Sequence, residues 1–333
     1  MAVQARREPR IPLEELCKLP SFFNPVVSWK GDQVAFYWDK TGRMEHFVMD
    51  LATRAFRQVS HGETPRALRT GFVWTRDDRE IAFGKDTGGN EQHDLYAIDV
   101  TTGAVRQLSS DPGAEEHAAE WSPDDEWLLV NTNKRLPEAL DRPGQLNLWK
   151  VKRDGTSYVP LTRHSFPAFA SASGWSKDGT RIAYVTNEDM SDLKNRDGYI
   201  VDPDGTHPRK VWSVRKGSQD TFGGWHPDSR RIAVTSDASG DNRAGILDVE
   251  TGEVRWLSAE GVEEHALRFS KDGRLLACIR NHESSVTPVI YDVSTGAART
   301  LKLPAGFAVG AQFFDQDRKL LVTYSTDVTR EAG

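Results

Sequence analysis

The chain has 333 residues, of which 38% are hydrophobic and 28% charged, a balance that is typical of a soluble globular protein. Its net charge of −6 argues against nucleic-acid binding as the main task, because phosphate contacts need a basic surface. The sequence contains neither an apolar run long enough to span a membrane nor an apolar core of signal-peptide length. We therefore expect a cytoplasmic protein with no membrane or nucleic-acid partner.

Residues 1–20 are predicted to form an N-terminal extension with a short helix over Ile11–Leu19. Pro12 stands near the start of this segment and Pro20 ends it, as is typical of a helix bounded by prolines. Residues 21–333 are then predicted to form one all-β domain. No long segment of this domain has helical periodicity.

A repeated unit is the strongest feature of the sequence from residue 29 onward. Each unit has an aromatic anchor, a polar tight turn with Asp or Gly, and an apolar strand. The anchors are Trp29, Trp74, Trp121, Trp175, Trp225, Phe269 and Phe313. Their spacing of 44 to 54 residues predicts the blades of a β-propeller, each with four short strands.

A second hairpin follows in six of the seven units, with a glycine such as Gly103 or Gly252 at its turn to supply the positive φ. We therefore predict a seven-bladed β-propeller in which each aromatic anchor packs between adjacent blades. The seventh unit lacks its second hairpin, because only nine residues follow Tyr324. We expect an incomplete last blade that residues after Gly333 complete, and self-association through its unpaired edge, so a homo-oligomer is compatible with the sequence.

The sequence carries no recognisable catalytic motif of its own. Neither Gly-x-Ser-x-Gly nor His-Glu-x-x-His occurs, and both phosphate-binding glycine patterns are missing. Cys278 lies in an apolar strand as a core residue, Cys17 lies in the predicted helix, and no disulfide or zinc site is expected. The segment Asp202–Gly205 is interpreted as a hairpin turn and not as a calcium loop, so no cofactor, metal or catalytic residue is predicted.

Two groups of charged residues need interpretation. Glu115-Glu116-His117 and Glu263-Glu264-His265 precede the third and sixth anchors at matching offsets, which favours a structural role between blades over cation binding. The segment Gly88 to His93 is glycine-flanked and acidic, and it is a flexible connection or presents the Glu91 carboxylate to a partner.

The whole chain resembles the N-terminal propeller of serine peptidases of the prolyl oligopeptidase family, especially the acylaminoacyl-peptidase branch. The resemblance rests on the lead-in Ile11–Pro20, the seven anchors, the loop Gly89-Asn-Glu-Gln-His93 with the following strand, and the segment Tyr324–Thr329. The anchors are also typical of Tol-system propellers and tricorn-type proteases, so the loop and the lead-in are the more specific features.

The resemblance implies an α/β-hydrolase domain with a Ser–Asp–His triad, all of it C-terminal to residue 333. It implies a propeller that restricts access to short or N-acylated peptides, and a substrate-cleft or domain-interface role for Glu91 and His93. Glu91 matches a family position whose carboxylate pairs with an arginine of the hydrolase domain. The chain alone is then not catalytic.

Two alternatives remain open. One is a stand-alone propeller that serves as a scaffold for protein–protein interaction. The other is a propeller enzyme with a metal in its central channel, for which the two Glu-Glu-His segments are the candidate ligands.

Overall fold

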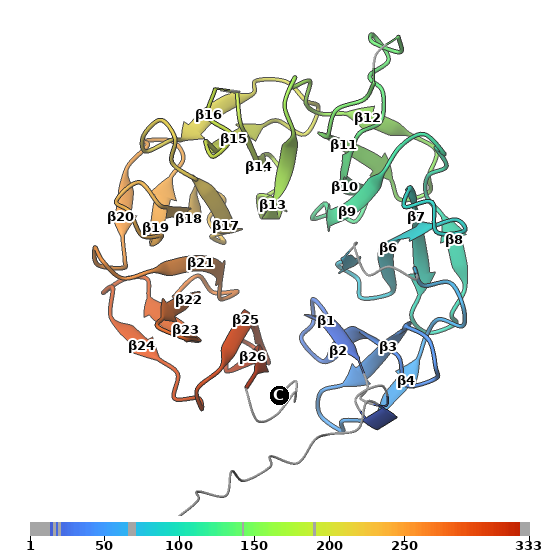
Figure 1. Cartoon of the computed structure of the whole chain (residues 1–333), viewed down its shortest axis with the longest axis horizontal. Coiled ribbons are helices and arrows are strands. Elements are labelled where there is room, and N and C mark those ends of the chain that lie inside the picture. The colour runs from blue at the N-terminus through green and yellow to red at the C-terminus, as the bar shows by residue number, and fades with distance from the viewer. Residues whose placement is uncertain are drawn as a thin grey trace, which may run out of the picture.

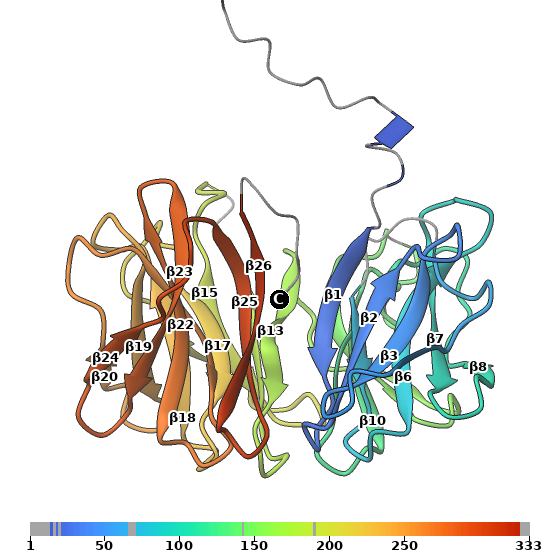
Figure 2. The ribbon, with the colours of Figure 1, turned by 90° about the horizontal axis from the view of Figure 1, so that it is seen from below.

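The computed structural model describes residues 14–15, 18, 21–65, 71–141, 143–188 and 191–326. These residues form 26 strands in sheets that stand radially around a central channel (Figure 1) and are antiparallel except for one strand pair. The all-β β-propeller class predicted from the sequence is confirmed. Figure 2 shows inner strands such as β1, β13 and β25 running along the channel from one face of the ring to the other.

Each sheet is built from consecutive strands. The first three sheets contain β1 (Phe22–Val27), β2 (Gln33–Trp38), β3 (Glu45–Asp50), β4 (Phe56–Gln58); β5 (Phe72–Trp74), β6 (Glu80–Asp86), β7 (His93–Asp99), β8 (Val105–Gln107); and β9 (Glu116–Trp121), β10 (Trp127–Thr132), β11 (Asn147–Lys152), β12 (Tyr158–Pro160). The fourth and fifth contain β13 (Ala168–Trp175), β14 (Ile182–Thr186), β15 (Asp197–Val201), β16 (Arg209–Trp212); and β17 (Thr221–Trp225), β18 (Arg231–Ser236), β19 (Arg243–Asp248), β20 (Val254–Trp256). The sixth contains β21 (Glu264–Phe269), β22 (Leu275–His282), β23 (Ser285–Asp292), β24 (Ala298–Thr300), β25 (Phe307–Phe314) and β26 (Lys319–Ser325).

The prediction of seven blades was wrong, because the described strands form six sheets. The seventh repeat is the hairpin β25–β26, and β25 pairs in parallel with β23 at Val286 and Phe307. A backbone hydrogen bond of 2.9 Å from Val286 N to Gly306 O supports this junction. Strand pairing defines a blade, so the turn recurs seven times while the terminal hairpin extends the sixth sheet to six strands. Self-association through the edge of β26 stays a prediction.

The predicted N-terminal helix is not among the elements of the described ranges, in which only Glu14 and Glu15 have helical backbone. Most of Ile11–Leu19, including Cys17, lies outside the described residues, as does the C-terminal segment after Thr326. The division of the chain at residue 20 stays a prediction.

Aromatic anchors fill the interfaces between sheets, as predicted. Trp121 is fully buried and packs with Leu95 of the second sheet and Leu128 of the third. Trp74, Trp175 and Trp225 are at most 2% exposed and occupy equivalent positions in other sheets. Burial of such large side chains is the dominant stabilising contribution in an interface of this kind.

The first anchor was assigned to the wrong residue. Val27 pairs with Val34 across its turn, as Trp74 pairs with Ile81, so Val27 holds the anchor position. Trp29 lies two residues further on, within the turn, and is only half-buried. Trp29 matches the aromatic pattern of the other anchors, but strand register gives the anchor position to Val27.

The fourth residue after each anchor position adopts a left-handed backbone. These residues are Gly31, Asp78, Asp125, Gly179, Ser229, Gly273 and Asp317, with φ between 57° and 80°. We call the face of the ring that carries these turns the turn face; it lies at the bottom of Figure 2. The opposite face, which carries residues 87–92, is called the loop face.

The last hairpin contacts the first sheet and so closes the ring. The side chain of Gln312 on β25 accepts a hydrogen bond from Val27 N at 3.2 Å and donates one to Pro25 O at 2.9 Å. Leu321 on β26 packs against the buried cluster around Phe36 of the first sheet. Side-chain contacts, and not shared strand pairing, join the two ends of the described ring.

Smaller predictions from the sequence agree with the structure. Gly103 and Gly252 have φ of 74° and 73° at the turns of their hairpins. Cys278 is fully buried in an apolar cluster of the sixth sheet. No helix in the described ranges is long and apolar enough to cross a membrane.

Candidate functional site

The central channel is the candidate site with the largest number of converging elements. It holds a cavity of about 610 Å³ lined by residues from the innermost strand or the following turn of every sheet and by the terminal hairpin. Cavities of this size are in the range that takes a small ligand or a few residues of a peptide. The anchor turns bring the lining residues together, because each turn ends an innermost strand at the turn face.

One layer of the channel is formed by the residue immediately before each anchor position. In this layer Val26, Val73, Glu120, Gly224, Arg268 and Gln312 line the cavity. Most are apolar or neutral, so the charged members stand out. A Cβ at Gly224 would lie 3.4 Å from the Cα of Arg268, which shows how closely the two innermost strands approach there.

Cationic side chains gather below this layer, toward the turn face. Arg76 and Lys177 occupy the same turn position in the second and fourth sheets, two residues after the anchor, and Arg268 comes from the layer above. Arg76 Nη2 lies 3.0 Å from Glu120 Oε1 and 3.2 Å from the backbone oxygen of Trp121. In the part of the chain that the structure describes, no carboxylate forms an ion pair with Lys177.

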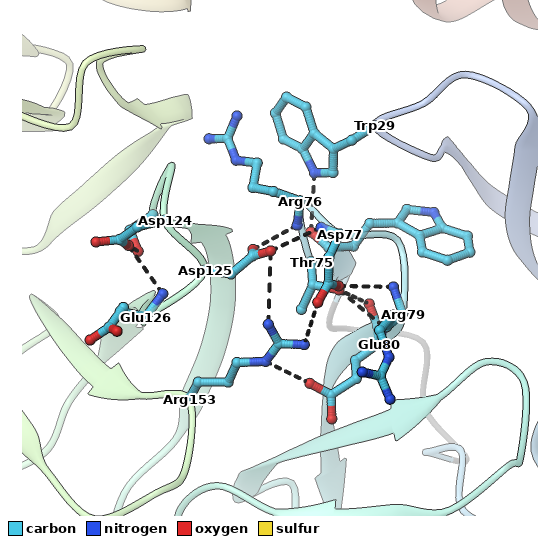
Figure 3. Close-up of polar contacts among 12 residues, drawn as sticks. Trp29, Thr75, Arg76, Asp77, Arg79, Glu80, Asp124, Asp125, Glu126 and Arg153 are labelled. Atoms are coloured by element: carbon cyan, nitrogen blue, oxygen red, sulfur yellow. Dashed lines mark hydrogen bonds and ion pairs between the residues drawn. The ribbon is translucent and has the colours of Figure 1, made fainter.

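Trp29 forms one wall of this cationic region. Its ring centre lies 3.6 Å from Arg76 Cζ and 5.6 Å from Lys177 Nζ. Figure 3 shows the indole of Trp29 beside the guanidinium of Arg76. A cation over an indole face is stabilised by the ring quadrupole, so Trp29 holds Arg76 in position while it keeps water away from one side.

The environment of Lys177 and Arg76 lowers the pKa of both side chains. Burial lowers the pKa of Lys177; Glu120 opposes this shift, and repulsion from Arg76 and Arg268 adds to it. Burial also lowers the pKa of Arg76, with the same opposition from Glu120 and the same repulsion from Arg268. The channel therefore holds positive charges that repel one another at short range.

A second charged region lies between the second and third sheets near the turn face (Figure 3). Arg153 follows β11 and reaches the second sheet, where its Nε lies 2.9 Å from Glu80 Oε2 and its Nη2 lies 3.0 Å from Asp77 Oδ2. Arg106 Nε contacts the other oxygen of Glu80 at 2.8 Å. This network fastens one sheet to the next.

The groove beside this network has a volume of about 770 Å³ and is lined by ten residues, all charged. Each of its four cations pairs with a carboxylate; besides Arg106 and Arg153, Arg79 lies 3.8 Å from Asp99 and Lys152 lies 3.9 Å from Asp154. The lining holds six carboxylates against these four cations, so it carries a net negative charge and every one of its cations is paired. The groove is therefore a joint between sheets and not a site for an anion.

The two sequence-predicted site residues lie close in the chain but differ in exposure. Glu91 is exposed on the loop face with φ of 58°, in the segment between β6 and β7. His93, at the start of β7, is fully buried, and neither ring nitrogen has a hydrogen-bond partner among the described residues. Only Glu91 can therefore reach a partner directly.

His93 contacts the first of the two Glu-Glu-His segments, residues 115–117. Its Nδ1 lies 3.7 Å from Glu115 Oε1, and His117 Nε2 lies 3.1 Å from the same oxygen. Glu116 is fully buried and accepts a hydrogen bond from the Ser109 hydroxyl. Burial raises the pKa of Glu116 to about 7. The predicted contact between sheets exists here, because His93 and Glu115 belong to different sheets.

In the second Glu-Glu-His segment the side chains of both glutamates contact residues of their own sheet. Glu264 is fully buried and accepts hydrogen bonds of 2.6 Å from Arg280 Nε and of 2.6 Å from the Tyr291 hydroxyl. Glu263 accepts a bond of 2.8 Å from the Asn281 amide. Both of these side-chain partners belong to the sixth sheet, but Glu264 N donates a hydrogen bond of 2.7 Å to Asn242 O, directly before β19 of the fifth sheet. The expected contact between sheets therefore exists here too, through the backbone.

Groups of three or more side chains placed to hold a metal ion are not found among the described residues. The turn interpretation of Asp202–Gly205 is confirmed, since Gly205 N donates to Asp202 O at 2.9 Å.

The channel cations were missed in the sequence because they stand in turns that were read as purely structural. Arg76 and Lys177 occupy the position two residues after the anchor, where the third and fifth units have Pro123 and Pro227. That contrast between charged residues and prolines was the available signal. It becomes informative only when the turns are known to converge on one channel.

The similarity of this chain to known protein families and curated proteins is low. No family model matches the chain. An uncharacterized protein of Agrobacterium fabrum is 25% identical over 187 residues, which are 52% of this chain and 58% of that protein. The aligned region thus spans less than two thirds of the length of that relative.

Solved structures are similar to this chain in fold. A prolyl endopeptidase matches with a TM-score of 0.70 at 14% identity, over 94% of this chain and 49% of its own. An oligogalacturonate lyase in complex with manganese matches with a TM-score of 0.69 at 18% identity, over 89% of this chain and 84% of its own. The β-propeller domain of the trilobed protease of Pyrococcus furiosus matches with a TM-score of 0.65 at 17% identity, over 93% and 91%. At these identities the likeness shows the β-propeller fold, shared by peptidase propeller domains and by a lyase.

Proposed function

We propose that this chain is the substrate-gating propeller of a serine peptidase. The observation that carries the proposal is the match with a prolyl endopeptidase, which covers 94% of this chain but only 49% of that one. The remainder of a chain organised in this way supplies a separate domain. The nucleophile motif that the chemistry needs is not among residues 1–333, so it would come from that domain.

The channel supports a gating role. Its cavity of about 610 Å³ has more apolar than polar lining, with charged groups near the turn face. Such a passage admits an extended peptide or a few residues and excludes a folded protein. We further propose short or N-acylated peptides as the substrates, in line with an acylaminoacyl-peptidase.

Glu91 is the residue we propose for contact with the hydrolase domain. It is exposed on the loop face, where a planar guanidinium of a docked domain can approach its carboxylate. We propose that His93, which is buried two residues further along the chain, supports the start of β7 through its contact with Glu115.

A peptidase assay tests the proposal. The 333-residue chain is expected to leave acetyl-alanyl and peptidyl chromogenic substrates intact, whereas the full product of the native gene is expected to hydrolyse them. A serine-reactive phosphonate should label that product on a Gly-x-Ser-x-Gly serine outside residues 1–333. Turnover by the 333-residue chain alone, abolished by the phosphonate, would contradict the proposal, as would a native product with no labelled serine.

A self-contained propeller is the second candidate, as a scaffold for a protein partner. It is favoured by the matches that cover 84% of the oligogalacturonate lyase chain and 91% of the trilobed-protease propeller, both chains of similar extent to this one. Recovery of a stoichiometric protein partner, together with a native product that ends near residue 333, would support this candidate over the peptidase.

A further inference from the structure

The turn-face end of the channel carries more positive than negative charge. Three cations and two carboxylates line the cavity: Lys177, Arg268 and Lys271, with Glu120 and Asp317. Arg76 lies beside it, in an ion pair with Glu120. The lining thus has one more positive than negative charge, which contrasts with the net charge of −6 for the whole chain. A positive patch inside an acidic protein concentrates anions at that place.

Other groups engage Glu120 and one oxygen of Asp317, whose buried Oδ1 has no hydrogen-bond partner among the described residues. Glu120 binds Arg76 at 3.0 Å and accepts a hydrogen bond of 3.0 Å from Trp175 N. Asp317 accepts a bond of 3.2 Å from Asp272 N. Neither forms an ion pair with Lys177 within the described ranges.

A bound anion would reduce the repulsion among the cations. Arg76 and Arg268 both disfavour the protonated form of Lys177, and Glu120 only partly compensates. A second carboxylate between Lys177 and Arg268 would satisfy the ammonium and reduce this repulsion. The aromatic wall, which includes Trp29, lowers the local dielectric constant and strengthens such an interaction.

We propose that the turn-face end of the channel is a binding site for a carboxylate group of the ligand. Lys177 and Arg268 are the binding residues in this site. Arg76 and Glu120 form an ion pair that positions the wall of the site, and Trp29 covers the site. The assignment of the carboxylate to the C-terminus of a short peptide rests on the proposed function, whereas the anion site itself does not.

Isothermal titration calorimetry on the 333-residue chain tests the site. The ligands are an N-acetylated neutral tetrapeptide with a free C-terminal carboxylate, the same peptide with a C-terminal amide, trigalacturonate and inorganic phosphate. We expect the free acid to bind at least about tenfold more tightly than the amide, since a hydrogen bond to a charged group contributes that much. The affinity for the acid should fall as salt is added, because ion pairing is screened.

Lys177→Met should weaken binding of the free acid at least about tenfold and leave binding of the amide unchanged. Lys302→Met is the matched control, because Lys302 is an exposed lysine after the outer strand β24. Arg268→Gln is a second test of the site should Lys177→Met melt at a lower temperature than the parent chain.

The outcomes separate the site from the proposed function. Equal binding of acid and amide, or unchanged binding by both site variants, overturns the carboxylate site and leaves the peptidase proposal standing on its own assay. Binding of trigalacturonate but not of the peptide acid, with the same dependence on Lys177, supports the site and contradicts the peptide assignment. Binding of phosphate alone overturns the carboxylate assignment.

Discussion

Asp125 in the third sheet accepts a hydrogen bond of 2.6 Å from the backbone N–H of Arg76 in the second sheet. Its other carboxylate oxygen accepts a bond of 2.9 Å from Asp77 N (Figure 3). Asp78 makes the same pair of contacts to Trp29 N and Lys30 N of the first sheet, at 2.6 Å and 2.8 Å. A turn aspartate of one sheet therefore caps the turn of the preceding sheet.

The residues in these turns match each other across the sheet boundary. Where the donor position holds Pro123 or Pro227, which have no N–H, the acceptor position of the next sheet is Gly179 or Gly273. Oxygen-bearing side chains stand at the acceptor position only when the preceding turn offers an N–H. The residue at the donor position of one turn thus limits the residue at the acceptor position of the next sheet, because an unpaired buried N–H or carboxylate is costly.

Replacement of Asp125 is the first prediction. Asp125→Ala should lower the free energy of unfolding by about 2–4 kcal/mol, because two hydrogen bonds to a charged group are lost. Asp125→Gly should be about 1 kcal/mol less destabilising than Asp125→Ala, since glycine adopts φ of 58° without strain. Urea unfolding measures both variants. Equal stabilities of the two variants would show that backbone strain plays no part at this position.

Ring closure gives the second prediction. Gln312→Ala removes both hydrogen bonds from β25 to the first sheet and should cost about 1–3 kcal/mol. Hydrogen exchange should speed up first in β1, β25 and β26, because they lose the contact that joins the ends of the ring. Gln145→Ala, at an exposed glutamine outside the strands, is the control. Uniform acceleration across all sheets would contradict a local closure.

Glu116 gives the third prediction, a pH dependence of stability. Burial raises its pKa to about 7 in the folded protein, from an ordinary value near 4.5. The folded state therefore binds this proton more tightly than the unfolded chain does. Its contribution to stability is present below about pH 4.5 and is lost as the pH rises through about 7.

Glu116→Gln should remove this loss, because the amide stays neutral and its oxygen still accepts from Ser109. The variant is expected to be about 2 kcal/mol more stable than the parent at about pH 8 and to show no such gain at about pH 4. Thermal or urea unfolding at both pH values is the measurement. The control variant Glu126→Gln, at an exposed position, should show no pH-dependent difference from the parent chain. If the stability of Glu116→Gln changed with pH in parallel with that of the parent chain, the raised pKa of Glu116 would be refuted.

Lys177 gives the fourth prediction, which concerns the proposed anion site. Because burial lowers its pKa, the ammonium should lose its proton at a lower pH than an exposed lysine does. Affinity for the peptide acid should therefore already decline in the pH range below the ordinary lysine pKa of about 10. Lys177→Arg keeps its charge throughout, so its affinity should be nearly constant over that range. A parent chain with a flat profile would argue against Lys177 as the binding cation.

Much of the fold could be predicted from the sequence, because it rests on local patterns. Buried anchors such as Trp121, the apolar strands after them and the hairpin glycines recur in the chain, and a repeated local pattern gives a repeated local structure. Short-range periodicity and composition alone predicted the all-β fold class, the turn at Asp202–Gly205 and the core position of Cys278.

Strand pairing and channel geometry were decided only by the tertiary structure. The parallel contact of Val286 with Phe307 places the terminal hairpin in the sixth sheet, and strand register moves the first anchor to Val27. Arg76, Lys177 and Arg268 are far apart in the chain and come within electrostatic range only when separate sheets share one axis. Local periodicity specifies each strand and turn, but the contacts between sheets depend on long-range geometry, which no single repeat contains.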